Sequence, residues 1–175
     1  MILEGDGVRL RAVEPEDLEL LYKWENEESD WKQSNTLVPY SRYTLKRYIA
    51  SSHKSLYETS QLRLMIDRAA DGLTVGTIDL FDFDHYHMRA GVGILIADPA
   101  ERRKGYASAA LGCIIAYAFD TIGLHQLWCN ILESNSDSMN LFRHHGFVLC
   151  ATKREWVRTR RSEERRVGKE CRSRW

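Results

Sequence analysis

Three consecutive basic residues and a glycine lie where an apolar strand is expected to lead into a helix. They are Arg102, Arg103, Lys104 and Gly105, and the apolar segment 107–119 follows them. The first N–H groups of a helix have no intrahelical partner and lie at the positive end of its dipole. Glycine also lets a ligand approach the backbone closely. The pattern predicts an anion site for a phosphate or pyrophosphate, and a helix start with solvated basic residues is the alternative.

The flanking segments indicate how this turn is positioned. Segment 90–96 is apolar, which predicts a strand covered on both faces, and Pro99 ends it because proline cannot donate to a ladder. Hydrophobic periodicity and turn residues predict a chain of the α/β class, with strands and helices in one domain. The predicted strands are 8–13, 62–67, 74–81, 90–96, 125–132 and 147–156, and the predicted helices are 14–22, 43–56, 107–122 and 138–145.

Composition limits the classes of protein that fit. The chain has 175 residues, of which 43% are hydrophobic, which is enough for a globular core. A formal net charge of zero argues against binding to nucleic acid or to a membrane surface, and no apolar run could span a bilayer. The four cysteines lack Cys-x-x-Cys spacing, so we expect a reduced, cytoplasmic protein without a metal site.

The C-terminal segment differs in character from everything before it. Residues 159–175 are highly charged and show no burial pattern, whereas residues 1–158 contain no linker. We therefore expect a single domain over 1–158, followed by a charged tail that is disordered or non-native. On this expectation the sheet has no closing strand.

The turn at 102–107 resembles motif A of the GCN5-related N-acetyltransferase (GNAT) family, Gln/Arg-x-x-Gly-x-Gly/Ala, and the resemblance extends from Val8 to Trp156. It implies an α/β fold with a mixed, twisted sheet that is flanked by helices. The fourth and fifth strands of this sheet splay apart around the pantetheine arm of acetyl-CoA. The residues that it assigns to this co-substrate are Ile94, Leu95 and Ile96 along the strand, Arg102, Arg103, Lys104, Gly105, Tyr106 and Ala107 in the turn, and Asn135.

Within the family, the chain resembles spermidine (diamine) acetyltransferases and ribosomal-protein N-terminal acetyltransferases, from Val8-Arg9-Leu10-Arg11 at the start to Gly146-Phe147 near the end. The family tyrosine that protonates the leaving thiolate falls at Phe142, so the acid is absent, and the resemblance implies a ring that faces the cofactor channel. Acidic positions that grip polyamines in the spermidine enzymes fall at Leu37, Val38, Leu45 and Gly91.

Candidate residues for the amine acceptor come from two polar segments. The acidic run 24–31 includes Glu28 and Trp31, and the connection 82–87 includes His85; both segments are also compatible with solvated loops. An ammonium group must lose a proton before it can attack, so a carboxylate base is useful. Asp79 and Asp82 are the candidates, because they lie on the strand and loop beside the central strand; solvated acids are the alternative.

These residues predict an acetyl-CoA-dependent enzyme that acetylates a primary amine by direct attack. The expected partner is a small-molecule amine, such as the polyamine spermidine, or a peptide amine; an N-terminal protein or aminoglycoside acetyltransferase is the alternative. A CoA-binding module without catalysis is a second alternative, which Phe142 favours. Assembly into a homo-oligomer stays open.

Overall fold

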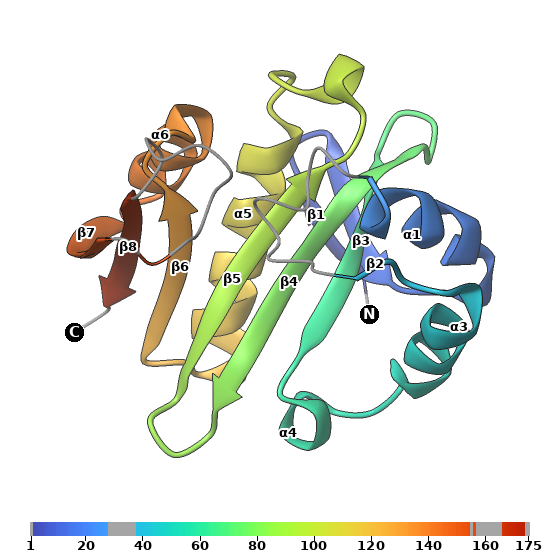
Figure 1. The fold of residues 1–175 in the computed structure, drawn as a ribbon, viewed down its shortest axis with the longest axis horizontal. Helices are drawn as coiled ribbons and strands as arrows, with labels where there is room; N and C mark the ends of the chain where they lie inside the picture. The colour runs from blue at the N-terminus through green and yellow to red at the C-terminus, as the bar shows by residue number, and fades with distance from the viewer. Residues whose placement is uncertain (1, 28–37, 155, 157–165, 174–175) are drawn as a thin grey trace.

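A mixed sheet of eight strands dominates the described part of the chain, which comprises residues 2–27, 38–154, 156 and 166–173 of a computed structural model (Figure 1). The strand order is β1-β2-β3-β4-β5-β6-β8-β7, and only the β5–β6 pair is parallel. The strands are β1 (Ile2–Gly5), β2 (Val8–Ala12), β3 (Leu62–Arg68), β4 (Thr74–Asp84), β5 (Arg89–Ile96), β6 (Gln126–Leu132), β7 (Val148–Arg154) and β8 (Arg166–Ser173).

The sheet has two wings that meet over a short distance. β5 pairs with β6 only where Arg89–Gly91 face Gln126–Trp128, whereas its ladder with β4 continues to Ile96. Beyond Gly91 the two strands diverge, as Figure 1 shows. We call the described residues before Gln126, which include β1–β5, the N-terminal wing. The described residues from Gln126 onward, which include β6, β7 and β8, are the C-terminal wing. Because β1 was not predicted, β5 and β6 correspond to the fourth and fifth predicted strands, 90–96 and 125–132. The divergence therefore lies between the two strands that were expected to splay apart.

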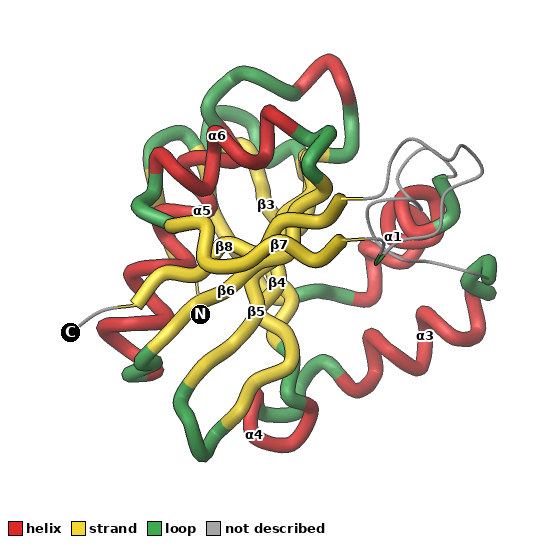
Figure 2. The backbone as a smooth tube through the Cα atoms, turned by 60° about the vertical axis from the view of Figure 1, so that its left-hand side comes forward, coloured by secondary structure: helices red, strands yellow, loops and turns green. Residues whose placement is uncertain are grey.

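Helices cover both faces of the sheet (Figure 2). One face carries α5 (Tyr106–Ala116) and α6 (Ser136–His144), and the other carries α1 (Leu18–Glu25) and α3 (Arg42–Ser51). The larger hydrophobic core joins the sheet to α5, and a smaller one joins Met65 of β3 to α1 and α3. None of the helices formed by the described residues has the length and apolar composition needed to cross a membrane.

Local signals explain most element boundaries. The Asn135 side chain accepts a hydrogen bond from the Ser138 N–H and caps α6. After α5, a π-helical segment (Tyr117–Ile122) ends at Gly123, which has a left-handed conformation. The predicted helix 43–56 is divided, since α3 ends at Ser51 and the short α4 begins at Leu56. The short 3₁₀ turns are η1 (Pro15–Asp17) and η2 (Pro99–Glu101).

The C-terminus differs from the expectation of a tail without a closing strand. Residues Arg166–Ser173 form β8, which lies between β6 and β7 and pairs antiparallel with both. A ladder is built from backbone groups, and a strand inserted between two others satisfies both of their edges. Side-chain patterning therefore did not reveal β8. The remaining residues of the predicted tail, 159–165 and 174–175, lie outside the described residues.

Candidate active site

The basic turn adopts a backbone conformation that only glycine takes without strain. Gly105 has φ of +90° and is the N-cap residue of α5, and Arg103 also has a positive φ of +62°. A Cβ added to Gly105 would meet no atom within 4 Å, so the space beside the first N–H groups of α5 is open. Tyr106 and Ala107 follow as partly buried residues packed on the core. The turn thus presents a helix start to an unfilled space, as an anion site requires.

Arg102 holds this turn against the end of β5. Its Nε donates to the carbonyl oxygen of Ile96 at 2.9 Å, and a second nitrogen donates to the Ala97 carbonyl at 3.4 Å. The sequence pattern assigned Arg102 to the cofactor together with its neighbours. In the structure its guanidinium instead connects the turn to the end of β5. The Ile96 carbonyl oxygen, which belongs to the segment assigned to pantetheine, accepts one of these hydrogen bonds.

The other two basic residues of the turn make ion pairs that differ in exposure. Arg103 lies 3.2 Å from Asp137 in the first turn of α6, so this pair joins the two wings, and its side chains are 85% and 73% exposed. Lys104 contacts Glu101 at 3.0 Å, and the Glu101 side chain is only 12% exposed and also contacts Arg68 at 3.3 Å. An exposed pair such as Arg103–Asp137 contributes at most about 1 kcal/mol, so Arg103 is the cation that can readily exchange its partner for a phosphate oxygen.

The edge of β5 continues the site from the turn toward β6. Gly93, Ile94 and Leu95 are partly buried, and they lie beyond the last residue pair with β6. An extended ligand arm could lie here as an additional strand, hydrogen bonded to the backbone. The residues that the family resemblance assigned to pantetheine, Ile94 to Ile96, therefore lie on the part of β5 where the ladder with β6 has ended, and no other described strand pairs with this edge.

Phe142 differs from the expectation that its ring faces a cofactor channel. The residue is only 3% exposed and packs edge-to-face against Phe147, with ring centroids 5.0 Å apart. Both rings belong to the larger core. The end of the same helix is tied to α5 by a contact of 2.8 Å between the Ser108 hydroxyl and His145 Nε2. In this structure Phe142 is thus a core residue of the C-terminal wing.

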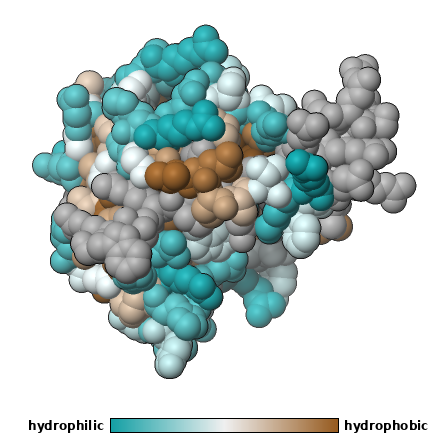
Figure 3. Space-filling view, turned by 90° about the vertical axis from the view of Figure 1, so that its left-hand side faces the viewer, coloured by the Kyte–Doolittle hydropathy of each residue, from teal (hydrophilic) through white to brown (hydrophobic). Residues whose placement is uncertain are grey.

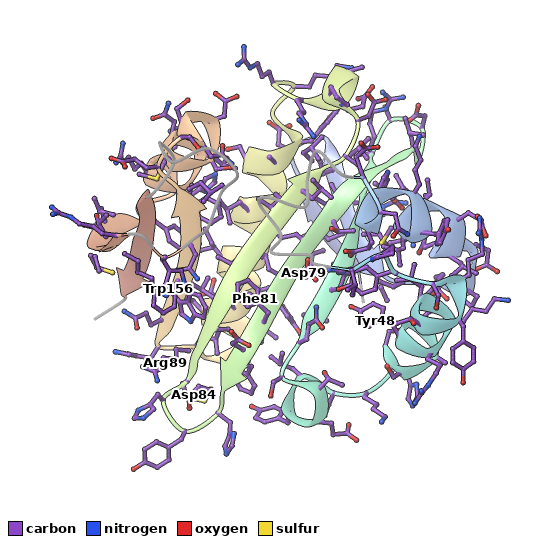
Figure 4. The ribbon with its side chains drawn as sticks, in the orientation of Figure 1. Tyr48, Asp79, Phe81, Asp84, Arg89 and Trp156 are labelled. Atoms are coloured by element: carbon purple, nitrogen blue, oxygen red, sulfur yellow. The ribbon has the colours of Figure 1, made fainter. Side chains whose placement is uncertain are left out.

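A charged cluster that the sequence did not reveal lies on the face of the sheet that carries α1 and α3 (Figure 4). Arg63 on β3 donates to Asp79 on β4 at 2.6 Å, and its guanidinium also contacts Glu25 at the end of α1. Gln61 donates to the same Asp79 oxygen at 3.3 Å, and the Tyr48 ring lies 5.5 Å from the Arg63 guanidinium. We call Glu25, Tyr48, Arg63 and Asp79 the charged cluster.

The charged cluster carries one more negative than positive charge. Burial by itself disfavours the Arg63 cation, but the charges of Asp79 and Glu25 outweigh it and raise the pKa of Arg63 above its ordinary value. Burial also raises the pKa of Tyr48, which therefore stays neutral at physiological pH. The excess carboxylate makes this face suited to an ammonium group.

The remaining acceptor candidates lie apart from this cluster. Asp82 is exposed and has a φ of +49° in an irregular part of β4, and His85 is exposed in the hairpin between β4 and β5. Asp84 shapes that hairpin by accepting the N–H groups of Tyr86 and His87. His85 is six positions after Asp79, a spacing that corresponds to at most about 20 Å at roughly 3.3 Å per residue. Glu28 and Trp31 lie outside the described residues.

A pocket of about 260 Å³ lies away from these groups. Its lining includes Met139 and Arg143 of α6 and Leu149 of β7, so it belongs to the outer part of the C-terminal wing. Figure 3, which faces that side, shows a small hydrophobic patch in a mainly hydrophilic surface. Among the described residues no group of three or more histidine, cysteine or acidic side chains could hold a metal ion.

Comparisons with known proteins agree with this geometry. The family model described as the acetyltransferase (GNAT) domain matches residues 8–148. The spermidine N(1)-acetyltransferase of Escherichia coli K12 is 27% identical over 144 residues, which cover 81% of this chain and 73% of that protein. The crystal structure of a spermidine N-acetyltransferase from Vibrio cholerae in complex with CoA and spermine has a TM-score of 0.83, 20% identity and 95% coverage of both chains.

Proposed function

Because this chain belongs to the GNAT acetyltransferase family, whose members use acetyl-CoA, we propose that it transfers the acetyl group to a primary amine by direct attack. The observation that carries the proposal is the divergence of β5 and β6 beside the open helix start at Gly105. The first acceptor to test is a polyamine such as spermidine, because relatives of the chain are named as spermidine acetyltransferases.

The cofactor half of the reaction rests on the turn and on β5. The N–H groups at the start of α5, with Arg103 and Lys104, bind the diphosphate of acetyl-CoA, and the pantetheine arm extends along Ile94 to Ile96. Backbone N–H groups of β5 polarise the thioester carbonyl, and such preorganised donors supply much of the rate enhancement in acyl transfer. Arg102 supports this arrangement by fixing the turn.

The acceptor half rests on the charged cluster. Its excess carboxylate attracts an ammonium ion to the face of β4 beside β5. An amine with a pKa of about 10.4 costs about 4.6 kcal/mol to deprotonate at pH 7, so a proton acceptor lowers the barrier. Asp79 pairs with Gly93, which lies beyond the last residue pair between β5 and β6, and its carboxylate can accept the proton through a water molecule. Asp82 is the second candidate. Phe142 has no acidic hydroxyl that could protonate the leaving thiolate. Solvent can supply this proton, because a thiol with a pKa of about 8.5 leaves as a thiolate of only modest basicity.

Thiol release from acetyl-CoA with a panel of polyamines, aminoglycosides and N-terminal peptides tests the proposal. Release above the rate without amine is expected for at least one class, and the product should contain one added acetyl group. Binding of CoA by calorimetry, with no release for any amine, would instead establish a CoA-binding module. The predicted cytoplasmic location can be tested by cell fractionation, and the open question of a homo-oligomer by light scattering.

A further inference from the structure

The aromatic ring of Phe81 on β4 occupies the space that any side chain at Gly91 of β5 would need. A Cβ added to Gly91 would lie 2.4 Å from a carbon of the Phe81 ring, so the ring lies directly over this glycine. The same ring packs edge-to-face against Trp128 of β6, with centroids 5.2 Å apart. Phe81 of β4 and Trp128 of β6 thus form one aromatic wall across Gly91 of β5, with one ring from each wing.

The aromatic wall lies where the two wings part. Gly91 pairs with Phe81 on one side and with Trp128 on the other, and it is the last residue of β5 that pairs with β6. The next residue of β5 on this face is Gly93, which pairs with Asp79. A Cβ on Gly93 would lie 3.5 Å from the Phe81 ring, in ordinary contact. On β4, the residue opposite Gly93 is therefore a carboxylate, Asp79, and the next residue on the same face carries an aromatic ring, Phe81.

This position coincides with the reacting end of the cofactor site. The phosphate turn follows the far end of β5, after Ile96, so an arm that starts there and runs along the strand ends near Gly93 and Gly91. Ile78 and Leu80 alternate with Asp79 and Phe81 and are buried in the core on the α5 side. Asp79 and Phe81 thus face the side that carries the charged cluster, as Figure 4 shows for the labelled residues.

We propose that the aromatic wall selects the acceptor. It contacts the carbon stem that carries the reacting nitrogen, while Asp79 and Glu25 attract the ammonium group. This inference rests on the proposed amine acetylation and narrows its substrate class to amines on a run of methylene or aromatic carbons. Carbohydrate amines, whose neighbouring carbons carry hydroxyl groups, are poor acceptors because the Phe81 ring offers no hydrogen-bond partner for these hydroxyl groups.

A homologous series of straight-chain amines from ethylamine to hexylamine measures the contact directly. These amines have similar basicity, so a trend in kcat/KM reports the burial of the added carbons. Each methylene that reaches the wall should raise kcat/KM by up to about fourfold, as expected for burial of one CH₂ group. Glucosamine should react more slowly than hexylamine by at least tenfold.

Phe81→Ala in the full-length chain should flatten this dependence on chain length while leaving CoA affinity unchanged. Phe81→Leu, which keeps the site apolar, should retain part of the slope. Tyr43→Ala is the matched control, because Tyr43 is a 70% exposed aromatic on α3, and its slope should equal that of the unmodified protein.

The outcomes separate this inference from the proposed function. Acetylation with no dependence on chain length, or with a slope that Phe81→Ala leaves intact, overturns the role of the aromatic wall alone. No acetylation of any amine by a protein that binds CoA overturns the proposed enzyme and this inference together. If Phe81→Ala does not fold, the dependence of kcat/KM on chain length is compared between the unmodified protein and Phe81→Leu. A smaller slope in Phe81→Leu supports the role of the aromatic wall, and an equal slope overturns it.

Discussion

The two wings of the sheet are built in different ways. In the N-terminal wing, each strand of β1–β5 pairs antiparallel with its neighbour in sequence, and α5 covers one face. In the C-terminal wing, β8 from the end of the chain separates β6 from β7. Within the described part of the sheet, the ladder that joins the wings contains three residue pairs, all between β5 and β6. The wing made of sequential neighbours holds the cofactor turn and the charged cluster, whereas the other wing depends on distant contacts. The proposed active site lies where the pairing between β5 and β6 ends.

The largest effect is expected from removing β8. Truncation after Arg160 deletes the ladders with β6 and β7 and leaves both edges without a strand. We expect the melting temperature to fall by about 10 °C or more, which corresponds to roughly 3 kcal/mol or more for a chain of this size. Calorimetry of both proteins measures it. A shift of only a few degrees would show that the C-terminal wing is stable without β8.

Arg63→Met should destabilise the N-terminal wing by about 3 kcal/mol, because it leaves Asp79 and Glu25 close together without their cation. Arg42→Met is the matched control, since the Arg42–Glu19 pair is exposed to solvent and its loss should destabilise the protein much less. Urea unfolding measures both. Equal losses in the two variants would mean that the charged cluster is solvated like a surface pair.

Phe142→Tyr tests whether the Phe142 side chain lies in the hydrophobic core or faces the bound cofactor. Because Phe142 is buried, an added hydroxyl without a partner should cost about 1–3 kcal/mol of stability. Thermal melts and acetyl transfer on the same variant provide the measurement. An unchanged melting temperature with higher turnover would instead place the hydroxyl at the thioester and restore the position of the family acid.

Gly105→Val should weaken CoA binding at least tenfold, or about 1.4 kcal/mol, because the side chain strains the turn and enters the space beside the α5 helix start. Gly72→Val is the control, since Gly72 also has a positive φ, +72°, and has open space around it. It imposes comparable strain in the β3–β4 turn. Similar CoA affinity in the two variants by calorimetry would remove the diphosphate site from this turn.

The smallest effect is expected for Asp137→Asn, which breaks the exposed pair that joins the wings. Releasing Arg103 for a phosphate should tighten CoA binding by less than about fivefold, and the gain should shrink at high salt. Calorimetric titration at two ionic strengths measures it. A tenfold loss of affinity would mean that Asp137 instead holds Arg103 in the orientation that binds the diphosphate.

Features encoded by neighbouring residues were predictable. The glycine before α5, the Asn135 cap, the Gly123 helix end and the hairpin of β3 and β4 each depend on a few consecutive residues. Their conformations follow from local sterics and hydrogen bonds, which are the same in any fold. The resemblance to the GNAT family rests on this kind of signal.

The charged cluster and the aromatic wall were not predictable in the same way. Glu25 and Arg63 are separated by 38 residues, and Phe81 and Trp128 by 47, so no spacing in the chain indicates their contacts. Arg63 is one arginine among many charged residues, and Trp128 is one apolar residue in an apolar strand. Asp79 was identified as a candidate base, but its partner Arg63 was not.

The sequence by itself determined the basic turn, the helix start behind it and the apolar strand that leads to it, because consecutive residues encode backbone conformation. Tertiary structure decided that Phe142 is buried, that Arg102 braces β5, and that a charged segment forms β8. It also brought Glu25 and Arg63 together, and Phe81 over Gly91. Burial and the pairing of distant groups depend on the register of the whole sheet, which no short segment specifies.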